Sequence, residues 1–328
     1  MSRAHWMAGG FGVMCHFLSH PPGSLSTETL SPDAWNRRVD SVDAEALAEQ
    51  VASTGARWLI FTLGQNTGYY CSPNAALDEL IGRIPGHLSR RDLLADVAAS
   101  LQQRGIRTIA YLPSHAPALD RRAVEALGCT PDWDASNWQL KPGTYVRSEA
   151  TDERLSRFQR NWESVVQEWS TRWGDAVSGW WIDGCYYGER MYHHDDEPNL
   201  ESFARALRSG NERAAVAFNP GVMVTCFGPA EDYTAGESMH NLAVSQWEGG
   251  FSPLKNPTGN SHLHILLPLG RNWCEGEQPR FNQNLAVGYS EYIASLGGGI
   301  SWDVPITTEG AIPRSFIQTL GAVGRALR

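Results

Sequence analysis

The stretch Gly179-Trp180-Trp181-Ile182-Asp183-Gly184 gives the clearest indication of the fold. Its apolar residues end in one carboxylate and a glycine, directly after a helical stretch over about residues 152–173. A (β/α)8 barrel builds its active site from the carboxyl ends of its strands and the loops that follow. A buried strand that ends in an acid therefore predicts this fold and a catalytic Asp183. The alternative is an aspartate that only caps a strand or turn before Gly184.

Apolar runs of strand length alternate with amphipathic helical stretches along the chain. This pattern predicts parallel strands joined by crossover helices. The eight candidate strands are Phe11–Phe17, Trp58–Leu63, Thr108–Leu112, Gly179–Asp183, Ala214–Asn219, Leu242–Trp247, His262–Leu269 and Gly299–Val304. The candidate helices cover about 44–54, 91–104, 152–173, 200–209, 281–296 and 314–327. Met223–Cys226 competes with the sixth candidate strand for its role.

The size and composition of the chain fit one soluble α/β domain. Its 328 residues match a (β/α)8 TIM-type barrel, which takes about 250 residues plus insertions, so we expect a single domain over residues 1–328 with room for irregular outer helices. No apolar run approaches the roughly 20 residues that span a bilayer, so no membrane partner is expected. The formal charge of -9 and the lack of clustered Lys and Arg argue against a nucleic-acid partner.

The start of the chain and the cysteines bear on its location. The first residues contain no basic segment followed by an apolar stretch and a cleavage site, so we expect a cytoplasmic protein unless a leader has been removed. The six cysteines are widely spaced, with no C-x-x-C pair and no zinc spacing, which indicates reduced thiols in or near the core. The oligomeric state is not predictable from these features.

Tryptophan is abundant and often stands beside polar residues. The chain has 13 Trp, with such neighbours at Trp35-Asn36, Trp133-Asp134, Asn137-Trp138 and Asn272-Trp273. A flat indole can cover the C–H face of a sugar while its neighbours hydrogen-bond the hydroxyl groups. The pattern favours a small carbohydrate or glycoconjugate as substrate, although each single Trp is also explained by packing.

A glycosidase needs a second carboxylate besides Asp183. A retaining enzyme uses a nucleophile and a general acid/base about 5 to 5.5 Å apart, and the acid has a raised pKa so that it can protonate the leaving oxygen. The two candidates are Glu237, which closes Asp232-Tyr233-Thr234-Ala235-Gly236-Glu237, and Glu248, in Gln246-Trp247-Glu248-Gly249. Either can be the acid/base, and the other can bind a hydroxyl group.

Taken in order along the chain, several motifs resemble glycoside hydrolase family 29, the α-L-fucosidases. The segments that carry the resemblance are Gly10–His16, Thr54–Tyr69, Arg91-Asp92-Leu93, Tyr111–Ser114, Trp181-Ile182-Asp183, Asp232–Glu237, Gly298–Pro305 and Glu309–Pro313. The resemblance spans roughly residues 8–328. It implies that Asp183 is the nucleophile and Glu237 the acid/base.

Two departures from that family concern sugar recognition. Gln65-Asn66-Thr67-Gly68 stands where the resemblance implies His-His-Asp-Gly, and Phe218-Asn219-Pro220-Gly221 stands where it implies an arginine. Gln and Asn still donate and accept hydrogen bonds but carry no charge. The preferred sugar therefore need not be fucose.

The remaining candidate residues fall near predicted strand ends or beside the two carboxylates. They are expected to bind substrate through hydrogen bonds or by walling the pocket. They are His16, Trp35, Gln65, Asn66, Tyr111, Trp181, Asn219 and Glu248.

No cofactor or metal is expected. The chain has no G-x-G-x-x-G before a helix, no Gly-Lys-Ser/Thr and no Gly-x-Ser-x-Gly. The run His193-His194-Asp195-Asp196-Glu197 offers ligand types, but adjacent residues in an exposed loop rarely converge on one ion.

The sequence as a whole predicts a retaining exo-glycosidase of α-L-fucosidase type. Asp183 would attack the anomeric carbon, and Glu237 would protonate the leaving oxygen and then activate water. Two alternatives remain open. One is an isomerase or lyase that acts on a free sugar, and the other is a carbohydrate-binding barrel that has lost catalysis.

Overall fold

The fold is built on a curled parallel sheet with helices on its outer side. The computed structural model describes residues 2–19, 30–83, 87–114, 120–129, 154–185, 191–239, 241–244 and 261–328. Seven strands pair in the order β5-β4-β3-β2-β1-β7-β6, and all the pairs are parallel. The strands are β1 (Phe11–Cys15), β2 (Trp58–Thr62), β3 (Arg107–Pro113), β4 (Val177–Asp183), β5 (Ala215–Phe218), β6 (His264–Pro268) and β7 (Gly299–Val304).

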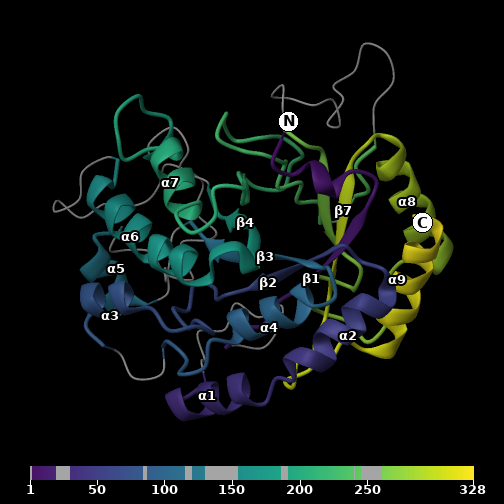
Figure 1. Ribbon diagram of the computed structural model, residues 1–328, viewed down its shortest axis with the longest axis horizontal. Helices are drawn as coiled ribbons and strands as arrows, with labels where there is room; N and C mark the ends of the chain where they lie inside the picture. The colour runs from purple at the N-terminus through teal and green to yellow at the C-terminus, as the bar shows by residue number, and fades with distance from the viewer. Residues whose placement is uncertain are drawn as a thin grey trace.

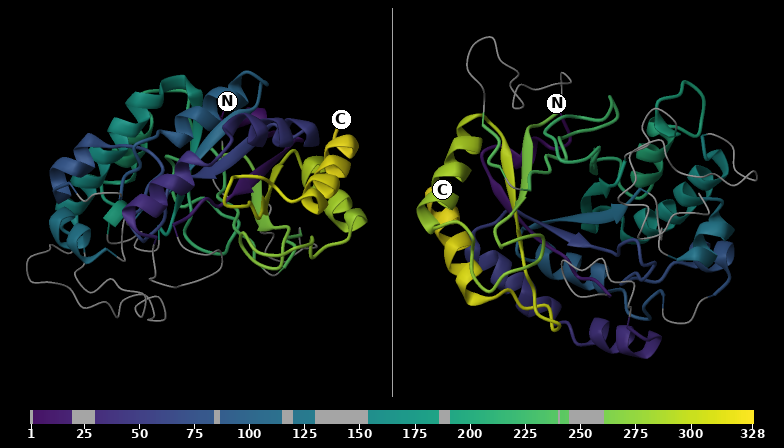
Figure 2. Two further views of the ribbon diagram at one scale, coloured as in Figure 1. Left: turned by 90° about the horizontal axis from the view of Figure 1, so that it is seen from below. Right: turned by 180° about the vertical axis from the view of Figure 1, so that it is seen from behind.

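Helices follow the strands and cover the convex side of the sheet (Figures 1 and 2). One group, α2, α8 and α9, lies together beside β1 and β7, and another, α3, α5, α6 and α7, lies beyond β3 and β4. The helices of the described part are α1 (Pro32–Asp40), α2 (Ala44–Thr54), α3 (Ala75–Ile81), α4 (Leu93–Gln102), α5 (Arg121–Leu127), α6 (Ser156–Trp173), α7 (Leu200–Leu207), α8 (Gln283–Ser295) and α9 (Arg314–Ala326). None of them is long and apolar enough to cross a membrane.

Polar side chains define where most helices begin. A side-chain oxygen at the N-cap accepts a backbone N–H of the first turn, which satisfies a donor that has no partner within the helix. This bond is present at Ser31, Asp43, Asn74, Asp92, Asp120, Asn199 and Asn282. Short 3-10 turns, η1 (His5–Met7) and η3 (Gly174–Ala176), lead toward β1 and β4.

Side chains alternate between the two faces of the sheet, as the period of two in a strand requires. On β4, Trp180 and Ile182 join the large core between the sheet and its helices, whereas Trp181 belongs to a smaller cluster on the concave face. The six cysteines are buried and none forms a disulfide, in agreement with the sequence.

The concave face also contains a buried polar layer. Ser301 Oγ lies 2.8 Å from both Trp58 Nε1 and His264 Nε2, and His264 Nδ1 lies 3.1 Å from the carbonyl oxygen of Thr234. Burial lowers the pKa of His264 to about 4. This imidazole is therefore neutral near pH 7 and holds the interior of the sheet together.

The described part of the eighth candidate strand is not a strand. Residues 242–244 form no strand, the rest of Leu242–Trp247 lies outside the described residues, and the competing Met223–Cys226 is not a strand either. Instead, residues 232–238 lie between the two edge strands. Asp232 N donates to Val216 of β5 at 2.9 Å, and Ser238 N donates to Leu266 of β6 at 2.8 Å. Seven regular strands and this irregular segment thus stand where eight strands were expected.

Gly236 allows the irregular segment to lie close to β6. Its φ is +67°, and a Cβ atom there would lie 1.9 Å from the carbonyl oxygen of His264. We predict that Gly236→Ala lowers the free energy of unfolding by strain of about 1–3 kcal/mol for the left-handed backbone plus roughly 1–3 kcal/mol for the clash. Denaturant unfolding measures this loss.

Gly297→Ala is the matched control for that substitution. Gly297 has φ +75°, but nothing lies within 4 Å of its Cβ position, so only the backbone strain applies. Equal losses of stability in the two variants would contradict the close approach of residues 232–238 to β6.

Candidate active site

Several of the residues that the sequence singled out meet at the carboxyl ends of the strands. Asp183 is the last residue of β4 and lies two positions after Trp181, so both side chains are on the concave face. The same spacing places Asn219 after Ala217 of β5, and Glu237 after Ala235 in the irregular segment. Alternation along three neighbouring segments therefore brings two carboxylates and one amide into one place.

Three hydrogen-bond donors surround the carboxylate of Asp183. Tyr111 Oη donates to Oδ2, while Asn219 Nδ2 and the backbone N–H of Gly184 donate to Oδ1 at 2.9 and 2.8 Å. Donors on both oxygens leave the carboxylate little freedom to rotate. Asp183 is thus held in one orientation by groups from β3, from the end of β5 and from its own turn.

Asn219 connects the two carboxylates. Its fully buried side chain donates from Nδ2 to Asp183 and, at 2.5 Å, to Glu237 Oε2. The backbone at this residue is fixed as well, because Asn219 N donates to Ile182 O at 2.7 Å. One amide nitrogen therefore sets the separation of Asp183 and Glu237.

Glu237 has a pKa that suits proton transfer near neutrality. Burial, and after it the negative charge of Asp183, raise the pKa of this carboxyl to about 7, although the hydrogen bond from Asn219 and the nearby His16 lower it in part. Near pH 7 the group is therefore divided between its protonated and ionised forms. Such a carboxyl can both donate and accept a proton at that pH.

His16 follows β1 and is held by a buried carboxylate. Its Nδ1 lies 2.7 Å from Asp303 Oδ1, and Asp303 Oδ2 accepts the backbone N–H of Cys274 at 2.6 Å. The ring of His16 also contacts Tyr111 edge-on and Trp273 at a tilt. His16 thus reaches the group around Asp183 in an orientation that Asp303 sets.

Stacked aromatic rings form one wall of the site. Tyr111 and Trp181, on β3 and β4, stack with centroids 5.3 Å apart and planes 13° apart. Gln65 Nε2 donates to Tyr111 Oη at 2.5 Å, and among the described residues its buried Oε1 has no hydrogen-bond partner. Gln65 therefore orients the tyrosine that donates to Asp183, and its Oε1 atom can still accept a hydrogen bond.

The structure does not bring every predicted residue to this place. Trp35 is fully buried on α1, where its ring packs against Phe17 and Tyr69 and its Nε1 donates to Tyr70 O at 3.3 Å. It belongs to the core beneath the helices rather than to the group around Asp183. Asn66 is half-buried in the turn after Gln65.

Two further predictions concern the second carboxylate and a metal. Glu248 lies outside the described residues, so only Glu237 can be placed relative to Asp183. Across the ranges that the structure describes, no three His, Cys, Asp or Glu side chains gather as a metal site would require.

Asp303 is the site residue to which the sequence analysis gave no role. It is fully buried at the end of β7, within the run Gly299-Ile300-Ser301-Trp302-Asp303-Val304. The sequence pattern that pointed to Asp183 is a lone acid near the end of an apolar strand. The run that contains Asp303 has the same pattern. Its partner His16 is 287 residues away in the chain, so their pairing is visible only in the fold.

Comparison with known proteins gives a fold but no family. No protein-family model and no curated protein matches this sequence. Among solved structures, the endo-fucoidan hydrolase P5AFcnA from glycoside hydrolase family 107 is similar, with a TM-score of 0.67, 15% identity and coverage of 98% of this chain and 92% of that one. The endo-fucoidan hydrolase MfFcnA4 is similar with a TM-score of 0.67 and 17% identity, and the match covers 98% of this chain and 53% of that one.

An α-L-fucosidase is similar as well. For alpha-L-fucosidase isoenzyme 1 from Paenibacillus thiaminolyticus the TM-score is 0.61, the identity 16%, and the coverage 98% of this chain and 74% of that one. The identities are too low to transfer an activity. The comparisons therefore establish that this chain has the fold shared by these glycoside hydrolases.

Proposed function

We propose that this chain is a retaining glycosidase that acts on a fucoside-like terminal sugar, with residues 1–328 as one catalytic domain. The observation that carries the proposal is the pair Asp183 and Glu237, joined by one amide nitrogen of Asn219. The two carboxylate oxygens cannot lie further apart than the sum of their distances to that nitrogen. This limit fits the about 5 to 5.5 Å of retaining enzymes, and inverting enzymes need roughly 6.5 to 9.5 Å to admit a water molecule.

The proposed roles follow from the surroundings of each group. Asp183, oriented by three donors, attacks the anomeric carbon and forms the glycosyl-enzyme bond as the leaving oxygen departs. Glu237 gives that oxygen its proton, then takes a proton from the water that cleaves the intermediate. The stacked Tyr111 and Trp181 offer an apolar wall for the sugar.

His16, Gln65 and Asn66 are proposed to bind hydroxyl groups of the sugar. The unpartnered Oε1 of Gln65 can accept a hydroxyl proton, and the half-buried Asn66 follows it in the same turn. The fold shared with an α-L-fucosidase and with endo-fucoidan hydrolases supports a fucoside-like substrate. The side chains of Gln65 and Asn66 are uncharged, which suits a neutral sugar.

The first experiment tests Asp183 as the nucleophile. On 4-nitrophenyl α-L-fucoside and a panel of other 4-nitrophenyl glycosides, Asp183→Ala should lower kcat/KM by on the order of 10⁴-fold for the hydrolysed member. Azide fits the space left by the carboxylate and should restore release of 4-nitrophenol, giving a glycosyl azide of inverted configuration. Fucoidan is tested in the same panel. If the protein cleaves fucoidan but none of the aryl glycosides, it acts within a chain (endo) rather than on a terminal sugar (exo).

Asn219→Ala serves as the control for that experiment. It removes the link between the carboxylates but leaves Asp183 in place, so its residual activity should not respond to azide. Hydrolysis of no substrate by a folded wild-type protein, or full activity in Asp183→Ala, would sink the proposal.

The second experiment uses the raised pKa of Glu237. Because the first step needs the protonated acid, kcat/KM should fall as the pH rises through about 7. Glu237→Gln should lower kcat/KM by roughly 10²–10⁴-fold for poor leaving groups and abolish this fall. With a 2,4-dinitrophenyl glycoside, which needs no acid, azide should trap the intermediate of Glu237→Gln as a retained glycosyl azide. An unchanged alkaline limb in Glu237→Gln would assign the acid role to another group.

The third experiment treats Asp303 as a positioning residue that acts through His16. Asp303→Asn keeps the size of the side chain but removes its charge, and kcat/KM should fall by roughly tenfold to a hundredfold, the range of a hydrogen bond to a charged group. The double variant Asp303→Asn with His16→Ala should lose no more activity than His16→Ala alone, because Asp303 acts through His16. Ser301→Ala on the same strand is the control, because it affects the polar layer below the site. Additive losses of kcat/KM in the double variant would leave Asp303 a structural role only.

A further inference from the structure

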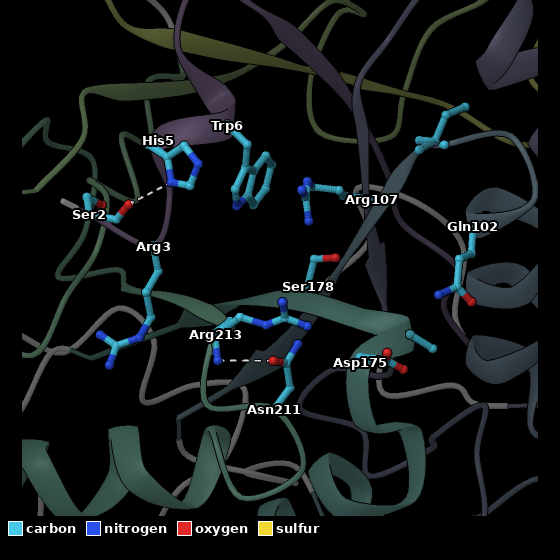
Figure 3. Close-up of a pocket in the computed structure, with 13 residues that line it drawn as sticks. Ser2, Arg3, His5, Trp6, Gln102, Arg107, Asp175, Ser178, Asn211 and Arg213 are labelled. Atoms are coloured by element: carbon cyan, nitrogen blue, oxygen red, sulfur yellow. Dashed lines mark hydrogen bonds between the residues drawn. The ribbon is translucent and has the colours of Figure 1, made fainter.

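A second cavity lies at the opposite end of the sheet from Asp183. Its volume is about 620 Å³, and it opens at the amino ends of β3 and β4 (Figure 3). Ser178 near the start of β4 lines it, whereas Asp183 ends the same strand five residues later. At about 3.3 Å per residue the two places are roughly 16 Å apart. The cavity is therefore separate from the candidate active site.

Two arginines from neighbouring segments, Arg107 and Arg213, line this cavity. Arg107 is the first residue of β3, and Arg213 lies two positions before β5. Because β3 and β5 flank β4, their side chains approach Ser178 from both sides. Figure 3 shows the guanidinium groups of Arg107 and Arg213 and the hydroxyl of Ser178 facing the same space.

The charges of these arginines are not balanced by nearby ion pairs. In the described part of the chain, no carboxylate forms a salt bridge with Arg107 or Arg213, whereas the third lining arginine, Arg3, pairs with Asp232 at 3.3 Å. Asp175 is the one acidic side chain among the lining residues. Two guanidinium groups without an ion pair to any described carboxylate thus face one cavity in a chain of formal charge -9.

Trp6 fixes one of the two arginines. The guanidinium carbon of Arg107 lies 5.0 Å from the centroid of the Trp6 ring, and this ring meets Trp58 of β2 edge-on at 5.7 Å. A guanidinium group held by an aromatic ring loses less freedom when it binds a ligand. Ser178 also lines the cavity, and its side-chain hydroxyl can add a neutral donor.

We propose that this cavity binds a small ligand through a sulfate or phosphate group, held by Arg107 and Arg213 with Ser178 between them. Two guanidinium groups on one side of a cavity match the several oxygens of such an anion, because each presents paired N–H donors. The size of the cavity leaves room for more than the anion, which fits an ester on a sugar-sized molecule. This binding does not depend on the proposed hydrolysis.

Calorimetric titration of the full chain tests the proposal with four probes at constant ionic strength. These are inorganic sulfate, inorganic phosphate, glucose 6-sulfate and glucose 6-phosphate. At least one should bind the wild type, and Arg107→Gln and Arg213→Gln should each weaken that binding by roughly tenfold to a hundredfold. Asp175→Asn should strengthen it, because it removes the lining carboxylate.

Arg83→Gln is the matched control, since it removes the same charge from a side chain that is 87% exposed and distant from the cavity in the chain. It should bind like the wild type. Tighter binding of an ester than of its free ion would identify the ligand as an esterified molecule, and equal binding would identify the ion itself. No binding of any probe, or equal binding by both arginine variants and the wild type, would overturn the proposal.

Two measurements keep the variants interpretable. Circular dichroism and the unfolding midpoint without ligand establish that each variant is folded. Glycoside hydrolysis by Arg213→Gln should equal that of the wild type, because the cavity lies at the far end of the strands. Failure of the hydrolysis proposal would leave the binding result intact, so the two proposals fail separately.

Discussion

Two carboxylates in one buried place repel each other, and the groups around Asp183 and Glu237 reduce this repulsion. Two charges a few ångströms apart in a poorly solvated site raise the free energy of the doubly ionised state. The amide of Asn219 donates to both groups and offsets part of this repulsion without adding a charge. Burial, and after it the charge of Asp183, raise the pKa of Glu237 to about 7, so one of the pair keeps a proton to near neutrality. Asp183 and Glu237 thus differ in their surroundings, as the proposed nucleophile and the proposed acid require, although both are carboxyl groups.

The parallel sheet makes this arrangement possible because it fixes direction and spacing together. Every strand presents its carboxyl end at the same edge, and alternation decides which side chains face inward. Tyr111, Asp183 and Asn219 are therefore neighbours although they lie far apart in the chain. Glu237 joins them from a segment that is not a regular strand, so its position rests on the hydrogen bonds of residues 232–238 to β5 and β6.

The sequence predicted the strands, whose apolar pattern repeats along the chain, but it did not predict features that depend on single long-range contacts. Seven candidate strands were confirmed because each is an apolar run that a buried parallel strand requires. The eighth candidate forms no strand over its described residues 242–244, and residues 232–238, which lie between the edge strands, are too polar to be predicted as a strand. Their polar groups are satisfied by long-range hydrogen bonds such as that from Thr234 Oγ1 to His264 O, 2.6 Å long. Helices α1, α3 and α5 were not among the candidate helices.

The site residues follow the same division. Asp183, Tyr111 and Trp181 stand in strands, so the period of two placed them correctly on one face. Trp35 was selected for its polar neighbours, but in a helix those neighbours point elsewhere, and its indole is part of the core. Asp303 received no role because its partner His16 is known only once β1 and β7 are seen to pair.

The neutral residue at position 219 has a consequence for the chemistry of the pair. The resemblance to α-L-fucosidases implied an arginine in this place, and a guanidinium group beside Glu237 would favour the ionised carboxylate and lower its pKa. Asn219 supplies the hydrogen bonds of such a group without its charge. Burial and the charge of Asp183 then dominate, and they keep Glu237 able to hold a proton near pH 7. An uncharged side chain at this place is therefore compatible with the proposed acid role of Glu237, provided that the amide spans both carboxylates.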